Sequence, residues 1–461
     1  MEKLPVKSKK AEIIRRVHAL PEVSFEDHRL TSFSGLVLFM ALFQRLGLMA
    51  RLRRCFAAVD RKRVFGLARV VMQLVIHVLL GFRRLRDRDY YARDPLIARA
   101  LGVHKIPDVS TMTRTLAHAS GTEVSRMAVL VRDLTLERLE AERLARVTVD
   151  FDGSVLSTKG HAEGTAIGFN PKCKGARSYY PLFCVISQVG MFLDRLHRAG
   201  NVHDSNGSIE FIRSCIESVQ GRLPRAVVES RLDSAFFNEP VLDALEALVV
   251  EYGVAVPFAR FPGLKHRVHS RERWGRIDDD WSYFELDWRP KSWSSKRRLI
   301  CIRRRRATRH KGPLQLDLFE PVDPDFEFKV IVTNKTTQAE NVLHFFNGRG
   351  LNESVYGEAK QFAALDYIPC RRRVANEIFT LSTMLAHNLG RELQIRASEP
   401  TRRTSRTRAP HYELKTLGTL RHLLIRQAGR LTRPQGALHL TTAASGIARR
   451  EFEAIYEALA A

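Results

Sequence analysis

The chain has 461 residues, a length that accommodates two or three domains with a sizeable core. Its 75 Lys and Arg residues outnumber its 50 Asp and Glu residues, which gives a formal net charge of +25. A field this positive indicates a polyanionic partner, most commonly a nucleic-acid backbone, and argues against a phosphohydrolase of small molecules.

The cysteines and the apolar segments indicate in which cellular compartment the protein is expected. Six cysteines stand far apart, with neither a CxxC pair nor zinc-finger spacing, so we expect a reduced cytoplasmic protein without disulfides. The N-terminus lacks the apolar core of a signal peptide. Residues 64–82 are apolar enough to suggest a membrane span, but Arg69, Gln73 and His77 recur there every four residues. That polar stripe predicts a buried helix of a soluble protein, with no membrane partner.

Residues from about 30 to 145 have the apolar periodicity of helices. Within them, a helix that begins at Pro95 and ends at Gly102 precedes a turn and a second helix capped near Ser110, which is the pattern of a helix-turn-helix. An ordinary helical hairpin is the alternative. The side chains of the second helix that could contact phosphates or base edges are Ser110, Thr111, Thr113 and Arg114.

Short strands replace the helices from residue 147 onward. A hairpin, a helix and then a strand that leads to Asp233 indicate a mixed sheet covered by helices. The predicted strands are 147–151, 180–188, 191–198, 225–229 and 255–258, and the predicted helices are 208–219 and 243–252.

Residues 274–332 are β-rich, aromatic and very basic, which predicts a β-subdomain inserted into the α/β core. Its strands are expected at 281–288, 298–306 and 326–333, around a loop that contains Lys311. A run of four arginines there is either a solvated strand end or a surface that contacts phosphates. These arginines are Arg303, Arg304, Arg305 and Arg306.

The C-terminal part is predicted to be helical again. One helix begins at Asn352, and a long one begins at Arg373 and is closed by Gly390. An Arg-rich linker and two short helices, near 420–428 and 450–459, follow.

The segment Val147–Ser154 is the strongest candidate site. Alternation along a strand places Asp150 and Asp152 on one face. Two carboxylates that close repel each other unless a cation lies between them, and hard oxygen ligands suit Mg²⁺ or Mn²⁺. A strand end that runs into an Asp-Gly turn is the alternative.

Two later acidic positions complete a possible metal site. Asp233 follows a strand, and Glu358 (or Glu353) lies on a helix. Two strand aspartates and one helix glutamate can converge at a sheet edge and hold two divalent ions for phosphodiester chemistry. With 50 carboxylates in the chain, a coincidental triple is also possible.

Six segments in one order resemble the DDE transposases of bacterial insertion sequences, most closely the branch called insertion-sequence group thirteen-eighty. They are VTVDFDGS, YYPLFCVIS, GNVHDSNGS, ESRLDSAFF, NESVYGEAK and RRRVANEIFTLSTMLAHNLG, and the resemblance spans residues 90–390. It implies a ribonuclease-H-like mixed-sheet core of the α/β class, with a β-rich insertion and a helical N-terminal region that takes part in binding the element's ends. It also implies cut-and-paste transposition with two Mg²⁺ (or Mn²⁺) ions, in a homodimeric complex with double-stranded element-end and target DNA.

The resemblance also implies roles for single residues. Asp233 matches the second catalytic aspartate, and both Asp150 and Asp152 fall on the first motif. Glu358 ends the third motif and is the first choice for the last acid, with Glu353 as the alternate. A regular helix separates these two glutamates by about 140°, so both cannot face one metal site.

The third motif departs from the pattern of the relatives. Val355 and Gly357 stand where an arginine and a lysine are usual, and Lys360 is the candidate to replace that lysine as a DNA contact.

These observations predict four parts of the chain. They are a helical DNA-binding or dimerisation region (1–145), a ribonuclease-H-like catalytic core (146–262 and 333–395), an inserted β-rich subdomain (263–332) and a basic linker with C-terminal helices (396–461). The predicted function is a bacterial, nucleoid-associated transposase that binds terminal inverted repeats and catalyses strand cleavage and strand transfer. A metal-dependent nuclease with the same core and an inactive, domesticated DNA-binding protein are the alternatives.

Overall fold

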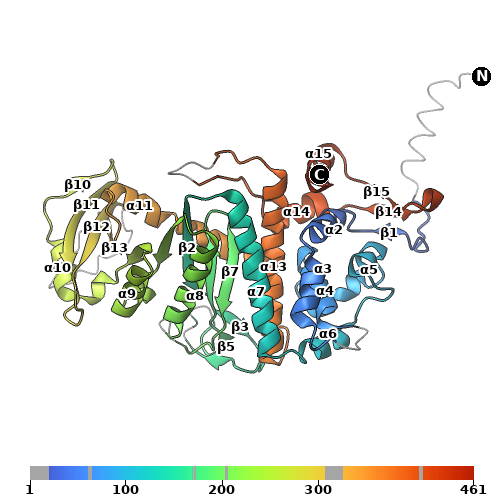
Figure 1. Ribbon diagram of the computed structural model, residues 1–461, viewed down its shortest axis with the longest axis horizontal. Helices are drawn as coiled ribbons and strands as arrows, with labels where there is room; N and C mark the ends of the chain where they lie inside the picture. The colour runs from blue at the N-terminus through green and yellow to red at the C-terminus, as the bar shows by residue number, and fades with distance from the viewer. Residues whose placement is uncertain are drawn as a thin grey trace, which may run out of the picture.

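The computed structural model describes residues 20–60, 65–168, 170, 173–202, 206–306, 325–403 and 409–460. The molecule is elongated (Figure 1), with a large sheet on one side and a helical region on the other. Two long helices, α7 (Gly121–Glu142) and α13 (Arg373–Ala397), stand between these regions. Both helices pack against β7 (Met191–Leu196), the last strand of the large sheet.

Nine strands form the large sheet, in the order β10-β11-β12-β13-β9-β8-β2-β6-β7. Its core strands are β2 (Arg146–Gly153), β6 (Leu182–Ile186), β7, β8 (Val227–Leu232) and β9 (Glu251–Ala255). β2, β8 and β9 run parallel, whereas β6 is antiparallel to both β2 and β7. In chain order, these core strands lie 3-2-1-4-5 with the second strand reversed. This arrangement confirms the predicted ribonuclease-H-like α/β core.

The strands of the basic insertion continue this sheet. They are β10 (Gly275–Arg276), β11 (Trp281–Trp288), β12 (Arg297–Arg305) and β13 (Phe326–Thr333). β13 pairs antiparallel with β9, and this pairing joins the insertion to the core. The predicted strands are confirmed, and the loop that contains Lys311 lies outside the described residues. A small separate sheet is formed by β3 (Leu156–Thr158), β4 (Ala166–Ile167) and β5 (Arg177–Tyr179).

One predicted helix extends too far. The prediction placed a helix over 243–252, but α9 spans Glu239–Ala247 and β9 begins at Glu251. Tyr252 is fully buried and its backbone N–H donates to Asn334 Oδ1 at 2.8 Å, so sheet pairing overrides the helical period there.

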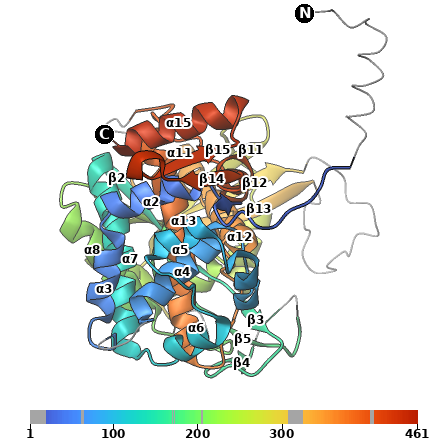
Figure 2. The ribbon, with the colours of Figure 1, turned by 90° about the vertical axis from the view of Figure 1, so that its right-hand side faces the viewer.

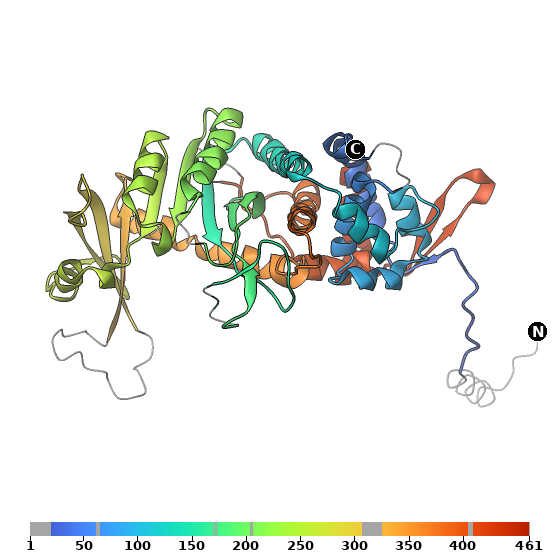
Figure 3. The ribbon, with the colours of Figure 1, turned by 90° about the horizontal axis from the view of Figure 1, so that it is seen from below.

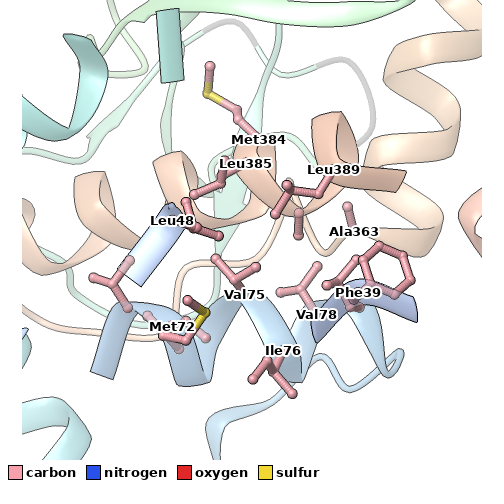
Figure 4. Packing of buried hydrophobic residues seen from close by; sticks show 14 of the residues in the cluster. Phe39, Leu48, Met72, Val75, Ile76, Val78, Ala363, Met384, Leu385 and Leu389 are labelled. Carbon is pink, nitrogen blue, oxygen red and sulfur yellow. The ribbon is translucent and has the colours of Figure 1, made fainter. Parts of the chain in front are cut away.

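The helical region surrounds α4 (Leu67–Leu79), which is buried along almost its whole length. The predicted polar stripe forms hydrogen bonds inside the protein: Gln73 Nε2 donates to the Pro107 carbonyl at 3.1 Å, and His77 Nδ1 lies 2.9 Å from the Tyr91 hydroxyl. In Figure 4, Val75 and Val78 of α4 face Leu385 and Leu389 of α13. None of the helices in the described ranges is long and apolar enough to cross a membrane. The other helices of this region are α2 (Leu36–Arg45), α3 (Leu48–Phe56), η1 (Leu85–Tyr91), α5 (Pro95–Leu101) and α6 (Val109–Leu116).

Helix α13 does not end at Gly390, as the sequence predicted, but continues to Ala397. A Cβ atom at Gly390 would lie 3.2 Å from Leu417 Cδ1, tighter than an ordinary van der Waals contact. This glycine therefore permits the close approach of α14 (Leu417–Leu420) rather than ending the helix.

The C-terminal segment returns to the N-terminal helical region (Figure 2). Only its last predicted helix is confirmed, as α15 (Gly446–Ala460), which packs on α2 and α13. The helix predicted at 420–428 is instead a short π-helical turn (Arg421–Ile425) after α14. Two strands that the sequence did not indicate follow, β14 (Gly429–Thr432) and β15 (His439–Thr442), and β14 pairs with β1 (Leu30–Thr31).

Candidate catalytic site

Two aspartates meet at the carboxyl ends of β2 and β8. These strands are parallel, and Asp150 stands opposite Arg231 in their register. Two residues further along both strands, Asp152 is level with Asp233. Asp233 lies directly after β8 and begins the 3-10 turn η2 (Ser234–Phe236), where its Oδ1 accepts a hydrogen bond from the backbone N–H of Ala235 at 2.9 Å. Its other oxygen, Oδ2, is directed toward Arg349.

The guanidinium of Arg349 lies between these two carboxylates. Its Nη2 is 3.3 Å from Asp152 Oδ2 and 3.7 Å from Asp233 Oδ2. The side chains of Asp152 and Asp233 are 25% and 35% exposed, so this end of the sheet is open to solvent. Arg349 directly precedes α12 (Gly350–Phe362), and sequence reasoning missed it. The available signal was a basic residue between two glycines, Gly348 and Gly350, just before the acidic helix.

Asp150 shares a face of β2 with Asp152, as strand alternation predicted, but it is fully buried. Arg231 holds it with two hydrogen bonds, from Nε to Oδ1 at 2.8 Å and from Nη2 to Oδ2 at 2.5 Å. Arg231 also donates to the Phe345 carbonyl at 3.0 Å and to Ser187 Oγ at 2.7 Å. Burial raises the pKa of Asp150, and the Arg231 pair opposes that shift. The ion pair of Asp150 and Arg231 is therefore buried in the protein, next to the solvent-exposed end of the sheet.

Glu358 lies away from the two aspartates. Its Oε2 forms an ion pair with Arg391 of α13, and its Oε1 accepts a hydrogen bond from the backbone N–H of Leu417 at 2.9 Å. On a regular helix Glu358 is about 180° from Arg349, the residue that contacts Asp152 and Asp233. The structure therefore brings Asp152 and Asp233 together but holds Glu358 on the opposite face of α12.

Glu353 lies on the same side of α12 as Arg349, the residue that contacts both aspartates. On a regular helix Glu353 is about 40° from Arg349 and about 60° from Tyr356. The Tyr356 ring packs 5.9 Å from the ring of Phe183, the residue paired with Asp152 across β6 and β2. Burial, followed by the neighbouring charge of Asp152, raises the pKa of Tyr356 well above its ordinary value. Glu353 is exposed on this face, and Lys360 lies further along it, about 20° from Arg349.

The site offers two carboxylates to a metal ion but not a complete set of ligands. Across the residues that the structure describes, no group of three or more His, Cys, Asp and Glu side chains is arranged to hold a metal ion. Asp152 and Asp233 nevertheless share one cationic group at the open end of the sheet. Two hard oxygen donors in that position fit Mg²⁺ or Mn²⁺, which bind through few carboxylates and keep part of their water.

The predicted helix-turn-helix elements are present as α5 and α6. Gly102 ends α5 in a left-handed conformation, and Asp108, rather than Ser110, caps α6 by accepting from the Thr111 backbone N–H at 2.7 Å. Of the candidate DNA contacts on α6, Ser110 and Arg114 are exposed and Thr111 is partly exposed. The Thr113 hydroxyl donates to the Val109 carbonyl at 2.9 Å, within its own helix.

Strand β12, which carries Arg303, Arg304 and Arg305, lies in the opposite half of the molecule from α6, and Arg306 directly follows this strand (Figures 1 and 3). Arg303 lies over the rings of Trp274 and Phe326, with its Cζ 4.7 and 4.5 Å from their centroids. Arg304 lies over Trp281 at 5.2 Å. Arg305 is exposed, and Arg306 Nε is 4.0 Å from Glu327 Oε1.

The strand order and the paired aspartates place the chain in the ribonuclease-H-like class of proteins. The family described as Transposase DDE domain group 1 matches residues 18–461, so the chain belongs to this family of DDE transposases. No curated protein sequence matches it.

Two solved structures that resemble the chain are also transposases. A piggyBac transposase synaptic complex with hairpin DNA is 12% identical, with a TM-score of 0.38, over 77% of this chain and 75% of its own. A Mos1 transposase paired-end complex with the left transposon end is 12% identical, with a TM-score of 0.18, over 54% and 68%. TM-scores this low assign neither a fold nor a role, so the family match carries the identification.

Proposed function

We propose that this protein is the transposase of a bacterial insertion sequence of the group thirteen-eighty branch. It binds the terminal inverted repeats of its element and, with a divalent metal, cleaves DNA strands and joins them to a target. The observation that carries this proposal is the meeting of Asp152 and Asp233 beside one cation at the carboxyl ends of β2 and β8. Membership of the DDE transposase family and the net charge of +25 support it.

The metal ligands in this proposal are Asp152, Asp233 and Glu353. Glu353 replaces Glu358 as the first choice, because it shares the face of α12 that carries Arg349, whereas Glu358 is held by Arg391. Asp150 is assigned to the support of the site, since its bidentate pair with Arg231 leaves it no access to solvent. Bound Mg²⁺, as two ions, would supply Lewis-acid stabilisation of the phosphate and a more acidic water or 3′-hydroxyl.

The protein's own residues position this chemistry. The hydrogen bond from Ala235 orients the carboxylate of Asp233, and its Oδ2 is directed toward Arg349. The buried Tyr356 and Phe183 rings form an apolar wall beside Asp152, which keeps water from that side of the carboxylate. These fixed groups would hold a scissile phosphate at the open end of the sheet.

The DNA partners are assigned to two separate surfaces. Ser110, Thr111, Thr113 and Arg114 of α6 are the candidate contacts for the element ends, and Lys360 of α12 is a further candidate. A second DNA surface is assigned to β12 with Arg303, Arg304, Arg305 and Arg306, where cationic groups stack on aromatic rings. Because α6 and β12 lie in opposite halves of the elongated molecule, one protomer could contact two stretches of DNA, as expected within a homodimeric complex on the nucleoid.

The test is Mg²⁺-dependent cleavage of DNA that carries the sequences flanking the coding region. Asp233→Asn should abolish cleavage and leave binding in a gel-shift assay nearly intact, whereas Asp287→Asn, at an exposed position on β11, should change neither. An Asp233→Asn protein that cleaves at a comparable rate would overturn the assignment.

The two alternatives predict different products in the same assay. Hydrolysed ends without strand-transfer products would indicate a nuclease. Binding of the ends without any cleavage by the unaltered protein would indicate a domesticated DNA-binding protein.

A further inference from the structure

Arg349 is the only cationic side chain that an ion-pair contact of the described residues joins to both Asp152 and Asp233. We propose that Arg349 is the resident counterion of the metal-free site, and that a divalent cation binds there by displacing its guanidinium from the two carboxylates. The inference rests on the proposed function, because it takes Asp152 and Asp233 as metal ligands. It adds a competition between an internal cation and the metal.

The contacts of Arg349 are those of a loosely held group. Its Nη2 lies 3.3 and 3.7 Å from the two carboxylate oxygens, longer than the roughly 2.7–2.9 Å of a charge-assisted hydrogen bond. Its buried Nε has no hydrogen-bond partner among the described residues. Arg349 is therefore attracted to the site by charge, with few directional bonds to hold it there.

Arg231 shows what a fixed arginine looks like on the same strand pair. It makes two hydrogen bonds to Asp150 at 2.8 and 2.5 Å and two more to Phe345 and Ser187. Four directional bonds inside the protein leave Arg231 no route to release Asp150. Of these two arginines, therefore, only Arg349 is expected to be displaced from its carboxylates by a metal ion.

The backbone around Arg349 permits such a displacement. A Cβ atom at Gly348 would lie 2.2 Å from Arg231 Nη1, so the glycine lets the chain run close against the fixed arginine. The side chain of Arg349 is itself 20% exposed, so one side of it faces solvent. A partly exposed side chain at the start of α12 can turn toward solvent while the helix stays in place.

Electrostatics predict whether loss of the Arg349 charge strengthens or weakens metal binding. With the guanidinium of Arg349 in place, the charge around the two carboxylates is one unit less negative than it is without the guanidinium. A divalent cation is attracted more strongly to the second arrangement, and it no longer has to displace a competitor. Removal of the Arg349 charge should therefore tighten metal binding by about tenfold or more, at charge separations of this size.

The experiment is a titration of the full-length protein with Mn²⁺ in the absence of DNA, with free Mn²⁺ followed by electron paramagnetic resonance. Arg349→Gln should bind Mn²⁺ about tenfold or more tightly than the unaltered protein. Arg54→Gln, which removes the same charge from an exposed position on α3, should bind as the unaltered protein does. Equal or weaker binding by Arg349→Gln would overturn the proposal.

Two further variants keep the result interpretable. Arg349→Lys retains the charge on a shorter side chain, and it should bind Mn²⁺ with an affinity between those of the unaltered protein and Arg349→Gln. It decides the question if Arg349→Gln unfolds without metal, and an affinity no tighter than that of the unaltered protein would then overturn the proposal. Asp233→Asn separates the two hypotheses: if it binds Mn²⁺ as well as the unaltered protein does, the metal site itself is misassigned. If it loses binding while Arg349→Gln gains none, only the counterion role fails.

Discussion

Asp150 and Asp152 lie two residues apart on the same face of β2, one enclosed in the sheet and the other at its open end. Asp150 has no exposed surface and a bidentate arginine, whereas Asp152 is 25% exposed and shares a more distant arginine with Asp233. Asp150 is held by two hydrogen bonds from Arg231 and has no exposed surface that a ligand could reach. Asp152 lies at the open end of the sheet, so solvent access distinguishes the two carboxylates.

Helix α12 also carries one buried, ion-paired carboxylate and one exposed carboxylate, here those of two glutamates. Glu358 is buried and is bound by Arg391 and the backbone of Leu417, whereas Glu353 is exposed on the face that carries Arg349. The same reasoning assigns Glu358 to the packing of α12 on α13 and α14, and Glu353 to the site.

The largest expected effect separates these two glutamates. Glu353→Gln should slow Mg²⁺-dependent cleavage of element-end DNA by about a thousandfold, because a lost metal ligand removes several kcal/mol of transition-state stabilisation. Glu358→Gln should cleave within a few-fold of the unaltered protein when rates are corrected for the folded fraction. Loss of cleavage in Glu358→Gln alone, with Glu353→Gln active, would return the catalytic role to Glu358.

The next effect concerns the free energy of unfolding. Asp150→Asn should lower it by about 3–5 kcal/mol, because Arg231 would be left buried without its counter-charge. Asp152→Asn should change it by less than about 1 kcal/mol, as expected at a partly exposed ion pair. Urea unfolding followed by circular dichroism measures both, and equal losses in the two variants would remove the distinction between the enclosed and the open aspartate.

The buried ion pair between Arg138 and Glu392 should make the stability of the protein depend on pH. Arg138 of α7 donates to both oxygens of Glu392 on α13, each at 2.7 Å. Burial raises the pKa of Glu392, but Arg138 and then Arg396 outweigh it and hold the pKa below its ordinary value of 4.5. A carboxylate with a depressed pKa stabilises the fold fully above its unfolded pKa and loses that contribution as the pH falls through its folded pKa.

Glu392→Gln should therefore cost about 1.5–3 kcal/mol at pH 7, and the deficit should shrink as the pH falls below about 4.5. Thermal unfolding of both proteins between pH 3 and 7, in steps of about half a unit, measures the difference. A deficit that stays constant across this range would show that the charge of Glu392 does not stabilise the fold.

The smallest effect belongs to the exposed DNA contacts. The affinity of the unaltered protein for DNA should fall steeply and linearly with salt on logarithmic axes, because Lys and Arg release counterions from phosphates. Arg114→Ala should weaken binding several-fold for any sequence and reduce that slope by about one. Arg54→Ala serves as the control of equal charge, and a slope unaffected by Arg114→Ala would exclude this residue as a phosphate contact.

The sequence predicted what depends on local patterns. Strand 281–288 has the predicted bounds, because it is rich in the aromatic residues that favour strands. The position of Asp233 directly after a strand also followed from such a pattern. The mixed sheet was predicted from the hairpin and the strand that leads to Asp233, and the ribonuclease-H-like class was predicted from the family resemblance; the topology confirms both.

The remaining features depend on contacts that are distant in the sequence. Arg349 and Asp152 are almost 200 residues apart in the sequence, so no local sequence pattern predicts their contact. The choice between Glu353 and Glu358 depends on how α12 is rotated relative to the sheet, which is set by its packing on α13 and α14. The role of Gly390 within α13 follows from the approach of Leu417, and β14 requires β1 at the other end of the chain.

The most direct test of the account is the position of a bound metal. Crystals of the protein soaked in Mn²⁺ should show an anomalous difference peak in contact with the carboxylates of both Asp152 and Asp233, with Glu353 as the third ligand and Arg349 moved away. Asp150 should remain paired with Arg231, and Glu358 with Arg391. A peak coordinated by Asp150 or Glu358, with Asp152 and Asp233 still bridged by Arg349, would contradict it.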